Sequence, residues 1–194
     1  MRIEFLTATH PERAKAEDHV RQIYAQTYDA CISSFPPLLA AAFNATGDTL
    51  CAAGIRTAED GFFSDCYLDS DFSTALLKRI GLAIDESQIM EVTSLASTSP
   101  FPVLSVLSSV IEWGRARGMV CGVFTATGAL RKLLRRTGLN HTPLFAADPN
   151  RLADPQVWGS YYATDPWVCA VLDSTDNQAR VARSPSPASE RRAF

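Results

Sequence analysis

A glutamate inside an apolar run is the residue with the clearest chemical potential. Glu91 lies in MEVTSLAST, residues 90–98, where the run turns from apolar to small and polar. A carboxylate that is removed from water favours its neutral form, so its pKa rises toward that of a useful general base. The residues alone leave one alternative open, a structural ion pair between Glu91 and a buried arginine.

Further hydroxyl groups follow Glu91 or end a later strand. Ser94, Ser97 and Thr98 offer hydroxyls to a carbonyl or phosphate oxygen, although residues 97–99 are equally suited to capping a helix. Thr125 and Thr127 end a second apolar strand, at the place where ligands bind open α/β sheets. No serine occupies a G-x-S-x-G elbow, which argues against a serine hydrolase.

Charge and aromatic rings concentrate in two later segments. One predicted helix carries Arg131, Lys132, Arg135 and Arg136 on its outward face, either as solvated surface or as a docking surface for an acidic protein. WGSYYATDPW, residues 158–167, is rich in aromatic side chains, which either pack a core or line a pocket.

Apolar periodicity predicts the elements that position these groups. We expect strands at residues 1–8, 62–69, 88–97, 119–127 and 165–173, two more around a hairpin at 44–48, and helices at 11–28, 72–84, 103–118 and from about 127 onward. This order predicts a single α/β domain over residues 1–173, with a mixed central sheet, helices on both faces, and parallel pairing near the two buried strands. Residues 174–194 have no apolar period and are expected to be a disordered tail.

Composition narrows the classes of function. The 194 residues carry a formal net charge of −3, so they exert no global attraction on nucleic acid or anionic lipid. We recognise neither a membrane span nor a signal peptide, and therefore expect a cytoplasmic protein. The five cysteines and three histidines lack metal-ligand spacing, so we expect reduced thiols and no metal site.

Several motifs together resemble those of the thermostable hemolysin family, whose fold is GNAT-like. They are FPPLL, AGIRTA, YLD, MEVTSLAS, FTATGALRKLLRRTGL, the Ala147 and Asp148 pair, and WGSYYATDPWV. The resemblance covers about residues 24–172, most of the chain. The strand around Glu91 also resembles that of acyl-homoserine-lactone synthases, GNAT-like enzymes that take acyl groups from acyl carrier protein.

The resemblance implies an N-acyltransferase that moves an acyl group from a thioester to a small-molecule amine, in small-molecule or natural-product biosynthesis. Its catalytic residues would be Glu91 as general base and Tyr161 or Tyr162 as general acid. The implied donor-binding residues are Ser94, Leu95, Ser97, Thr98, Thr125, Thr127 and Arg131. The implied residues of the acceptor pocket are Arg56, Tyr67, Asp69 and Trp158.

The sequence departs from these patterns in three places. GNAT enzymes bind the pyrophosphate of coenzyme A with a basic loop, R/Q-x-x-G-x-G/A, whereas residues 97–104 here read STSPFPVL. The Gly-Asn that usually follows Glu-Val in the hemolysin family is replaced by Thr93 and Ser94. The usual position of the GNAT general-acid tyrosine holds Leu134.

The loop without glycine affects the expected donor, because backbone amides cannot approach a pyrophosphate closely there. We expect the phosphopantetheine thioester of an acyl carrier protein, docked on Lys132, Arg135 and Arg136, in preference to coenzyme A. No tightly bound cofactor is expected, and an aminoacyl-tRNA donor is disfavoured by the sequence pI of about 5.6. Two other classes stay open: thioester hydrolysis or cyclisation by the same fold, and a non-catalytic binding protein or membrane-active hemolysin.

Overall fold

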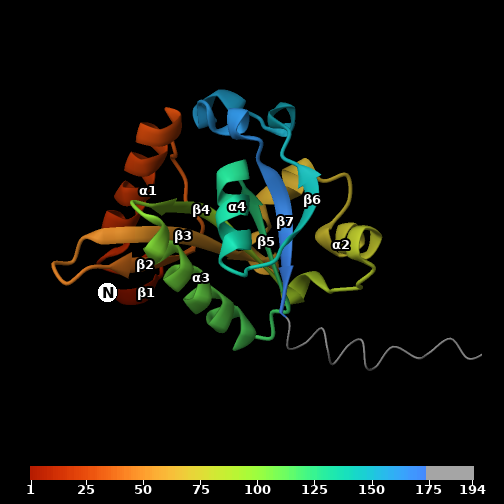
Figure 1. The fold of residues 1–194 in the computed structure, drawn as a ribbon, viewed down its shortest axis with the longest axis horizontal. Helices are drawn as coiled ribbons and strands as arrows, with labels where there is room; N and C mark the ends of the chain where they lie inside the picture. The colour runs from red at the N-terminus through yellow and green to blue at the C-terminus, as the bar shows by residue number, and fades with distance from the viewer. Residues whose placement is uncertain (174–194) are drawn as a thin grey trace, which may run out of the picture.

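Seven strands form one mixed sheet in the spatial order β1-β2-β3-β4-β5-β7-β6 (Figure 1). The structure, a computed structural model, describes residues 1–173, so the tail predicted for residues 174–194 lies outside the described residues. The strands are β1 (Arg2–Leu6), β2 (Leu38–Phe43), β3 (Thr49–Thr57), β4 (Ile89–Ser97), β5 (Cys121–Ala126), β6 (Thr142–Ala146) and β7 (Trp167–Leu172). The α-helices are α1 (Arg13–Tyr28), α2 (Phe72–Ile80), α3 (Pro100–Arg115) and α4 (Gly128–Arg136). Six 3-10 helices complete the described part: η1 (Ala58–Asp60), η2 (Phe63–Tyr67), η3 (Glu86–Gln88), η4 (Pro149–Arg151), η5 (Pro155–Trp158) and η6 (Tyr161–Thr164).

Helices cover both faces of the sheet, as the strand pattern of β2 shows. Alternate residues of a strand point to opposite faces, so Leu39 and Ala41 pack with α1 while Ala40 and Ala42 pack with α3. Figure 1 shows α3 and α4 together in front of the sheet. The predicted α/β fold with a mixed sheet and helices on both faces is confirmed.

The two central strands pair and then part. β4 and β5 run parallel, and their pairing extends from Ile89 and Cys121 to Val92 and Phe124. β4 continues from there to Ser97 along β3, while β5 turns away toward α4. We call the gap that opens beyond Val92 and Phe124 the fork.

A bulge in β4 lies at the fork. Gly54 of β3 pairs with Thr93 of β4, and Ala52 pairs with Ala96. Two steps along β3 therefore correspond to three steps along β4, so β4 carries one extra residue here. Ser94 sits in the bulge with a left-handed φ of 50°. A bulge reorients the backbone and interrupts regular pairing, so the segment after Glu91 no longer follows the simple alternation of a flat strand.

The strand predicted at residues 62–69 is wrong, because this segment forms η2. β3 is already paired on both edges, with β2 and β4, so a further strand at this point has no partner. The amides of Phe63 and Ser64 turn instead toward the carboxylate of Glu91.

Several boundaries also differ from the prediction, most clearly those of α2 and α3. α2 ends at Ile80 rather than at Ile84, because Gly81 adopts a left-handed φ of 72° and its N–H bonds the carbonyl of Leu77. α3 includes Pro100 and Pro102 in its first turn, where a helix needs no N–H donor from the proline. No helix within residues 1–173 is long and apolar enough to cross a membrane.

Candidate active site

Glu91 is fully buried, and its carboxylate is held by the start of η2. Oε2 accepts the N–H of Phe63 at 2.6 Å, and Oε1 accepts the N–H of Ser64 at 2.9 Å. The Ser64 hydroxyl also donates to Oε1, at 2.6 Å. Within the described residues no basic side chain is close enough to form an ion pair with Glu91, so the alternative of a buried arginine partner is wrong.

Two opposing effects set the protonation of this carboxyl. Loss of water is the larger, and it raises the pKa of Glu91 above its ordinary value. The hydrogen bonds from Ser64 and Phe63 and the positive charge of Arg56 act in the opposite direction, because each favours the ionised form. A buried carboxyl with a raised pKa is suited to accepting a proton, and the three donors hold it in position.

Two cavities meet at the fork. The larger, of about 570 Å³, extends from α3 and α4 through the fork to α1, and Val103, Leu133 and Thr27 are among its lining residues. The smaller, of about 310 Å³, lies on the face of Glu91 and Ser64. Both cavities are lined by Tyr24, Val92, Thr93, Ser94, Thr125 and Tyr161. We call the larger the donor cavity and the smaller the acceptor cavity, after the roles predicted from the sequence for residues that line them.

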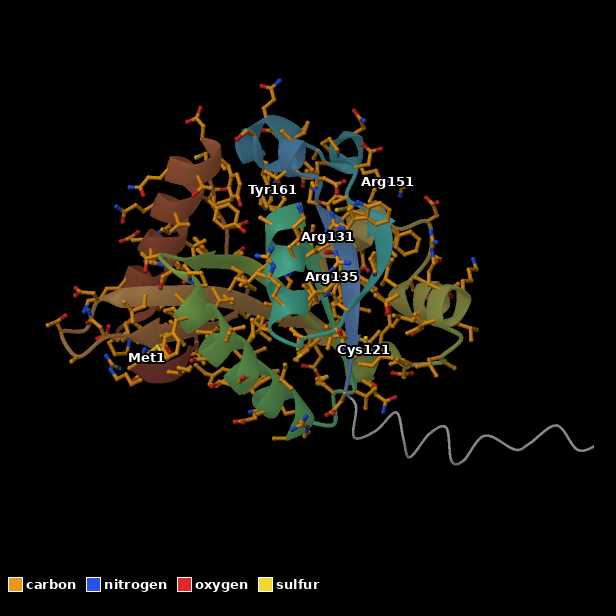
Figure 2. The ribbon with its side chains drawn as sticks, viewed as in Figure 1. Met1, Cys121, Arg131, Arg135, Arg151 and Tyr161 are labelled. Carbon is orange, nitrogen blue, oxygen red and sulfur yellow. The ribbon has the colours of Figure 1, made fainter. Side chains whose placement is uncertain are left out.

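The aromatic segment forms one wall of the acceptor cavity. Trp158, Tyr161 and Tyr162 contact one another and the rings of Tyr24 and Tyr28 on α1. Tyr161 is buried, its hydroxyl donates to the carbonyl of Thr125 at 3.4 Å, and Figure 2 shows it between α1 and α4. Burial raises the pKa of Tyr161 well above its ordinary value, so the hydroxyl stays protonated.

Two further tyrosine hydroxyls lie on the acceptor side. The hydroxyls of Tyr67 and Tyr162 hydrogen-bond each other, and both residues line the acceptor cavity. Burial raises the pKa of Tyr162 to about 12. Arg56 also lines this cavity and donates to the carbonyls of Asp60 and Gly61, each at 3.2 Å. Of the four predicted acceptor residues, the structure therefore brings together Arg56, Tyr67 and Trp158.

The fourth, Asp69, does not line either cavity. Its side chain is 88% exposed and forms an ion pair with Arg151. Arg131, predicted to point outward and to bind the donor, also takes another role. Its side chain is only 12% exposed and donates to the carboxylate of Asp165 at 2.5 Å and to its carbonyl at 2.8 Å. The prediction of an outward Arg131 is wrong, because Asp165 draws the guanidinium back onto the domain.

The remaining predicted donor residues line the donor cavity. They are Ser94, Leu95, Ser97, Thr98, Thr125 and Thr127. Thr127 in addition caps α4, because its Oγ1 accepts the N–H of Leu130 at 3.2 Å. Ser97 donates to the carbonyls of Leu50 and Ser99. Ser99, at the N-cap of α3, makes no side-chain capping bond, so the predicted capping role of residues 97–99 is not seen at that residue.

Two site residues were not predicted from the sequence. Ser64 binds Glu91 directly, and it was missed because residues 62–69 were assigned to a strand. The hydroxyl of Thr93 is buried at the fork and has no hydrogen-bond partner among residues 1–173. The sequence signals for Thr93 are its place two residues after Glu91, on the same side of the strand, and its departure from the glycine usual in the hemolysin family.

Gly159 allows the aromatic segment to dock on the end of α1. Its φ is 51°, and a Cβ at this position would lie 2.0 Å from the carbonyl oxygen of Tyr28. We expect Gly159→Ala to destabilise the fold by about 1–3 kcal/mol beyond the strain of the left-handed backbone itself. Gly118→Ala is the matched control, because its φ is 77° and no atom lies within 4 Å of the added Cβ. Chemical denaturation of both variants measures the difference, and equal losses would show that the contact with Tyr28 is immaterial.

Comparison with known proteins bears on the family and the fold. The sequence profile of the family described as thermostable hemolysin matches residues 6–175. No curated protein sequence matches the chain.

Three solved structures have a similar fold at low sequence identity. The acyl-homoserine lactone synthase LasI aligns with a TM-score of 0.60 and 10% identity over 88% of this chain and 89% of its own. BjaI, described as a CoA-dependent acyl-homoserine lactone synthase with SAM and isopentyl-CoA, aligns with a TM-score of 0.57 and 12% identity over 95% and 90%. FeeM, an N-acyl amino acid synthase from uncultured soil microbes, aligns with a TM-score of 0.55 and 18% identity over 88% and 92%. The predicted resemblance in fold is thereby confirmed.

Proposed function

Because this chain belongs to the thermostable hemolysin family and shares its fold with synthases that form acyl amides, we propose that it is an N-acyltransferase. It would move an acyl group from a thioester to the nitrogen of a small-molecule amine. The family name supplies no chemistry, so the proposal rests on the site.

One observation carries the proposal: two cavities meet at the fork, beside a buried carboxylate. A thioester bound on the α3 and α4 side and an amine bound on the Glu91 side would meet where β4 and β5 part. Holding two reactants in this way converts a bimolecular reaction into an effectively unimolecular one.

The edge of β4 would position the thioester. β4 runs past its last pair with β5, so its backbone N–H and C=O groups from Thr93 onward face the fork without that partner strand. Such groups suit the carbonyl of a thioester and the amides of a pantetheine arm. The bulge at Ser94 orients them away from the regular ladder.

The proton transfers assign roles to two residues. Glu91 would accept the proton that the attacking amine loses. Tyr161 would protonate the leaving thiolate, because it lines both cavities and its hydroxyl lies beside the carbonyl of Thr125 at the fork. Tyr162 lines only the acceptor cavity and is already bonded to Tyr67, which makes it the weaker choice.

We propose an acyl carrier protein as the donor. Residues 97–103 contain neither glycine nor a basic side chain for the pyrophosphate of coenzyme A. Lys132, Arg135 and Arg136 are exposed on α4 beside the donor cavity, and Figure 2 shows Arg135 one turn along α4 from Arg131. Phe101, 72% exposed in the first turn of α3, offers an apolar contact next to that cavity. A basic face with one exposed aromatic ring suits an acidic helical protein.

The apolar end of the donor cavity, away from the fork, is expected to set which acyl-chain lengths the protein accepts. The cavity extends from the fork to Met90, Gly122 and Met119, an apolar channel suited to an acyl tail. A Cβ on Gly122 would lie 3.7 Å from Cε of Met90, so a side chain fits there without a clash. We expect Gly122→Val to reduce kcat/KM for long acyl chains by roughly 10–200-fold while sparing short ones. Chain-length profiles from butyryl to palmitoyl thioesters measure this, and an unchanged profile would place the acyl tail elsewhere.

A panel experiment tests the proposed function. Butyryl to palmitoyl thioesters of an acyl carrier protein and of coenzyme A are incubated with amino acids, amino acid esters and S-adenosylmethionine, and products are read by intact mass. An acyl-amide product supports the proposal. Free acid or a cyclised product without amide would support the hydrolase or cyclase alternative. Dye release from liposomes by detergent-free protein, with no turnover of any thioester, would support a membrane-active hemolysin instead.

A further inference from the structure

We propose that Ser64 and Thr125 form a two-hydroxyl proton relay from the fork to Glu91, so that the base acts on the amine without touching it. This inference rests on the proposed acyl transfer. It concerns the route of the proton, on which neither the fold nor the family match bears.

Burial rules out a direct contact between Glu91 and a substrate. Glu91 and Ser64 lie in the wall of the acceptor cavity, yet both are 0% exposed to a water-sized molecule. An amine nitrogen is no smaller than a water molecule and cannot reach the carboxylate while this packing holds. Thr125 is only partly buried and lines both cavities. Of the three relay residues, Thr125 is therefore the one that a substrate can reach.

The number of protons on each hydroxyl determines which group donates in each hydrogen bond of the relay. The hydroxyl of Ser64 donates its one proton to Oε1 of Glu91 at 2.6 Å. Its oxygen lies 2.8 Å from Oγ1 of Thr125, so in that contact Thr125 must donate and Ser64 accept. The lone pairs of Thr125 Oγ1 then remain to accept a hydrogen bond from an amine at the fork. Every hydrogen bond points toward the carboxylate, which is the order that a relay needs.

The topology explains why these three groups line up. Glu91 and Val123 are register partners in parallel strands, so Thr125, two residues further along β5, lies on the same face of the sheet as Glu91. η2 crosses that face and places Ser64 between the two. The amides of Phe63 and Ser64 bind one oxygen of the carboxylate each, so Oε1 is held in place to receive the proton from the Ser64 hydroxyl.

The transfer balances without an external reagent. The amine nitrogen attacks the thioester carbonyl carbon and forms the C–N bond. Its proton passes to Thr125 Oγ1, the Thr125 proton passes to Ser64, and the Ser64 proton passes to Oε1 of Glu91. The tetrahedral intermediate then collapses, the C–S bond breaks, and the thiolate leaves with a proton from Tyr161. Return of the proton from Glu91 through the same hydroxyls, and on through solvent to Tyr161, restores the resting state.

Variants that remove the hydroxyl of Thr125 or Ser64, and leave Glu91 intact, test the relay. Thr125→Val keeps the β-branched shape in β5 but removes the hydroxyl, and Thr125→Ser keeps the hydroxyl. With the carrier thioester and amine that the panel shows to be most active, we expect Thr125→Val and Ser64→Ala each to lower kcat by roughly 10²-fold or more. Thr125→Ser should recover most of the wild-type kcat. Thr142→Val is the control, because it makes the same change at an exposed strand position on β6, outside both cavities.

A solvent-isotope readout separates a relay from simple positioning. In mixtures of H₂O and D₂O, a relay moves several protons at once, so the rate of the wild type should fall along a curve rather than a line. Full kcat in Thr125→Val, a failure of Thr125→Ser to rescue, or a linear isotope dependence would overturn the relay and leave the acyltransferase proposal standing. No acyl transfer by the wild type with any donor and amine would overturn both.

Discussion

Replacing Glu91 with glutamine is expected to lower kcat by roughly 10²–10⁴-fold, because the side chain keeps its size but can no longer accept a proton from the amine. The effect should fall on kcat more than on KM, since Glu91 is 0% exposed and contributes no contact surface to either substrate. Steady-state kinetics with the best donor and amine measures it. A variant that retains more than about a tenth of the wild-type kcat would rule out the carboxylate as the base.

Glutamine also changes the local hydrogen bonds, so stability must be measured alongside activity. If its carbonyl keeps the two Ser64 donors, its NH₂ group faces the N–H of Phe63, and two donors oppose each other. Such an unsatisfied buried group costs about 1–3 kcal/mol. Glu86→Gln is a matched control, because Glu86 Oε1 accepts the N–H of Phe72 at 3.1 Å outside both cavities. It should lose some stability and retain its activity.

The raised pKa of Glu91 gives this prediction a pH signature. The base must be ionised, so the rate should rise with pH through a midpoint above the ordinary value of 4.5, and Glu91→Gln should lack that limb. The contribution of Glu91 to the free energy of unfolding changes with pH in the opposite direction from the rate. The folded state holds the proton at higher pH than the unfolded state, so the contribution of Glu91 is full below 4.5 and is lost as pH rises through the raised pKa. Urea unfolding across pH, compared between wild type and variant, measures the second effect.

Reversing the charges of Arg135 and Arg136 to glutamate is expected to raise the KM for an acyl carrier thioester by roughly 10–100-fold, because attraction to an acidic partner becomes repulsion. Both side chains are exposed, so the wild-type reaction should also weaken with salt, which screens exposed charges beyond about 10 Å at 0.1 M. Small acyl-pantetheine substrates, which enter the donor cavity without docking on α4, should be unaffected.

Lys78 and Arg79 provide the control for that reversal. They are also two adjacent, exposed basic residues in the last turn of a nine-residue helix, but on α2, which lines neither cavity. Glutamate at both positions should leave the carrier KM unchanged. Equal turnover of free acyl-CoA, insensitive to salt and to the reversals on α4, would refute the carrier-protein donor.

Apolar periodicity predicted most of the fold, because it is a local property of each segment. The parallel core of β4 and β5, the helices that cover it, and Glu91 on the central strand all follow from runs and breaks in the sequence. The site was predicted less completely because its decisive bonds join distant segments. Ser64 lies 27 residues from Glu91 and 61 from Thr125, and nothing around FFSDCYLD signals that its amides bind a carboxylate.

Arg131 shows the same limit for surface charge. Helical spacing placed it with the outward basic residues, but its partner Asp165 lies 34 residues away on the loop before β7. Helical spacing predicts the face of the helix on which a residue lies. It does not predict an ion pair with a carboxylate from a distant segment, which changes the direction of the side chain. The three residues that remain exposed, Lys132, Arg135 and Arg136, have no such partner among the described residues.

Because the two cavities meet at the fork, the structure also predicts the order in which the two substrates bind. Since donor and amine would occupy separate cavities, neither needs to bind before the other, and the kinetic scheme should be sequential with random addition. An acyl-enzyme intermediate is not required, so initial-rate plots should intersect rather than run parallel. The N-acyl product would span both cavities, and so it should inhibit competitively against either substrate.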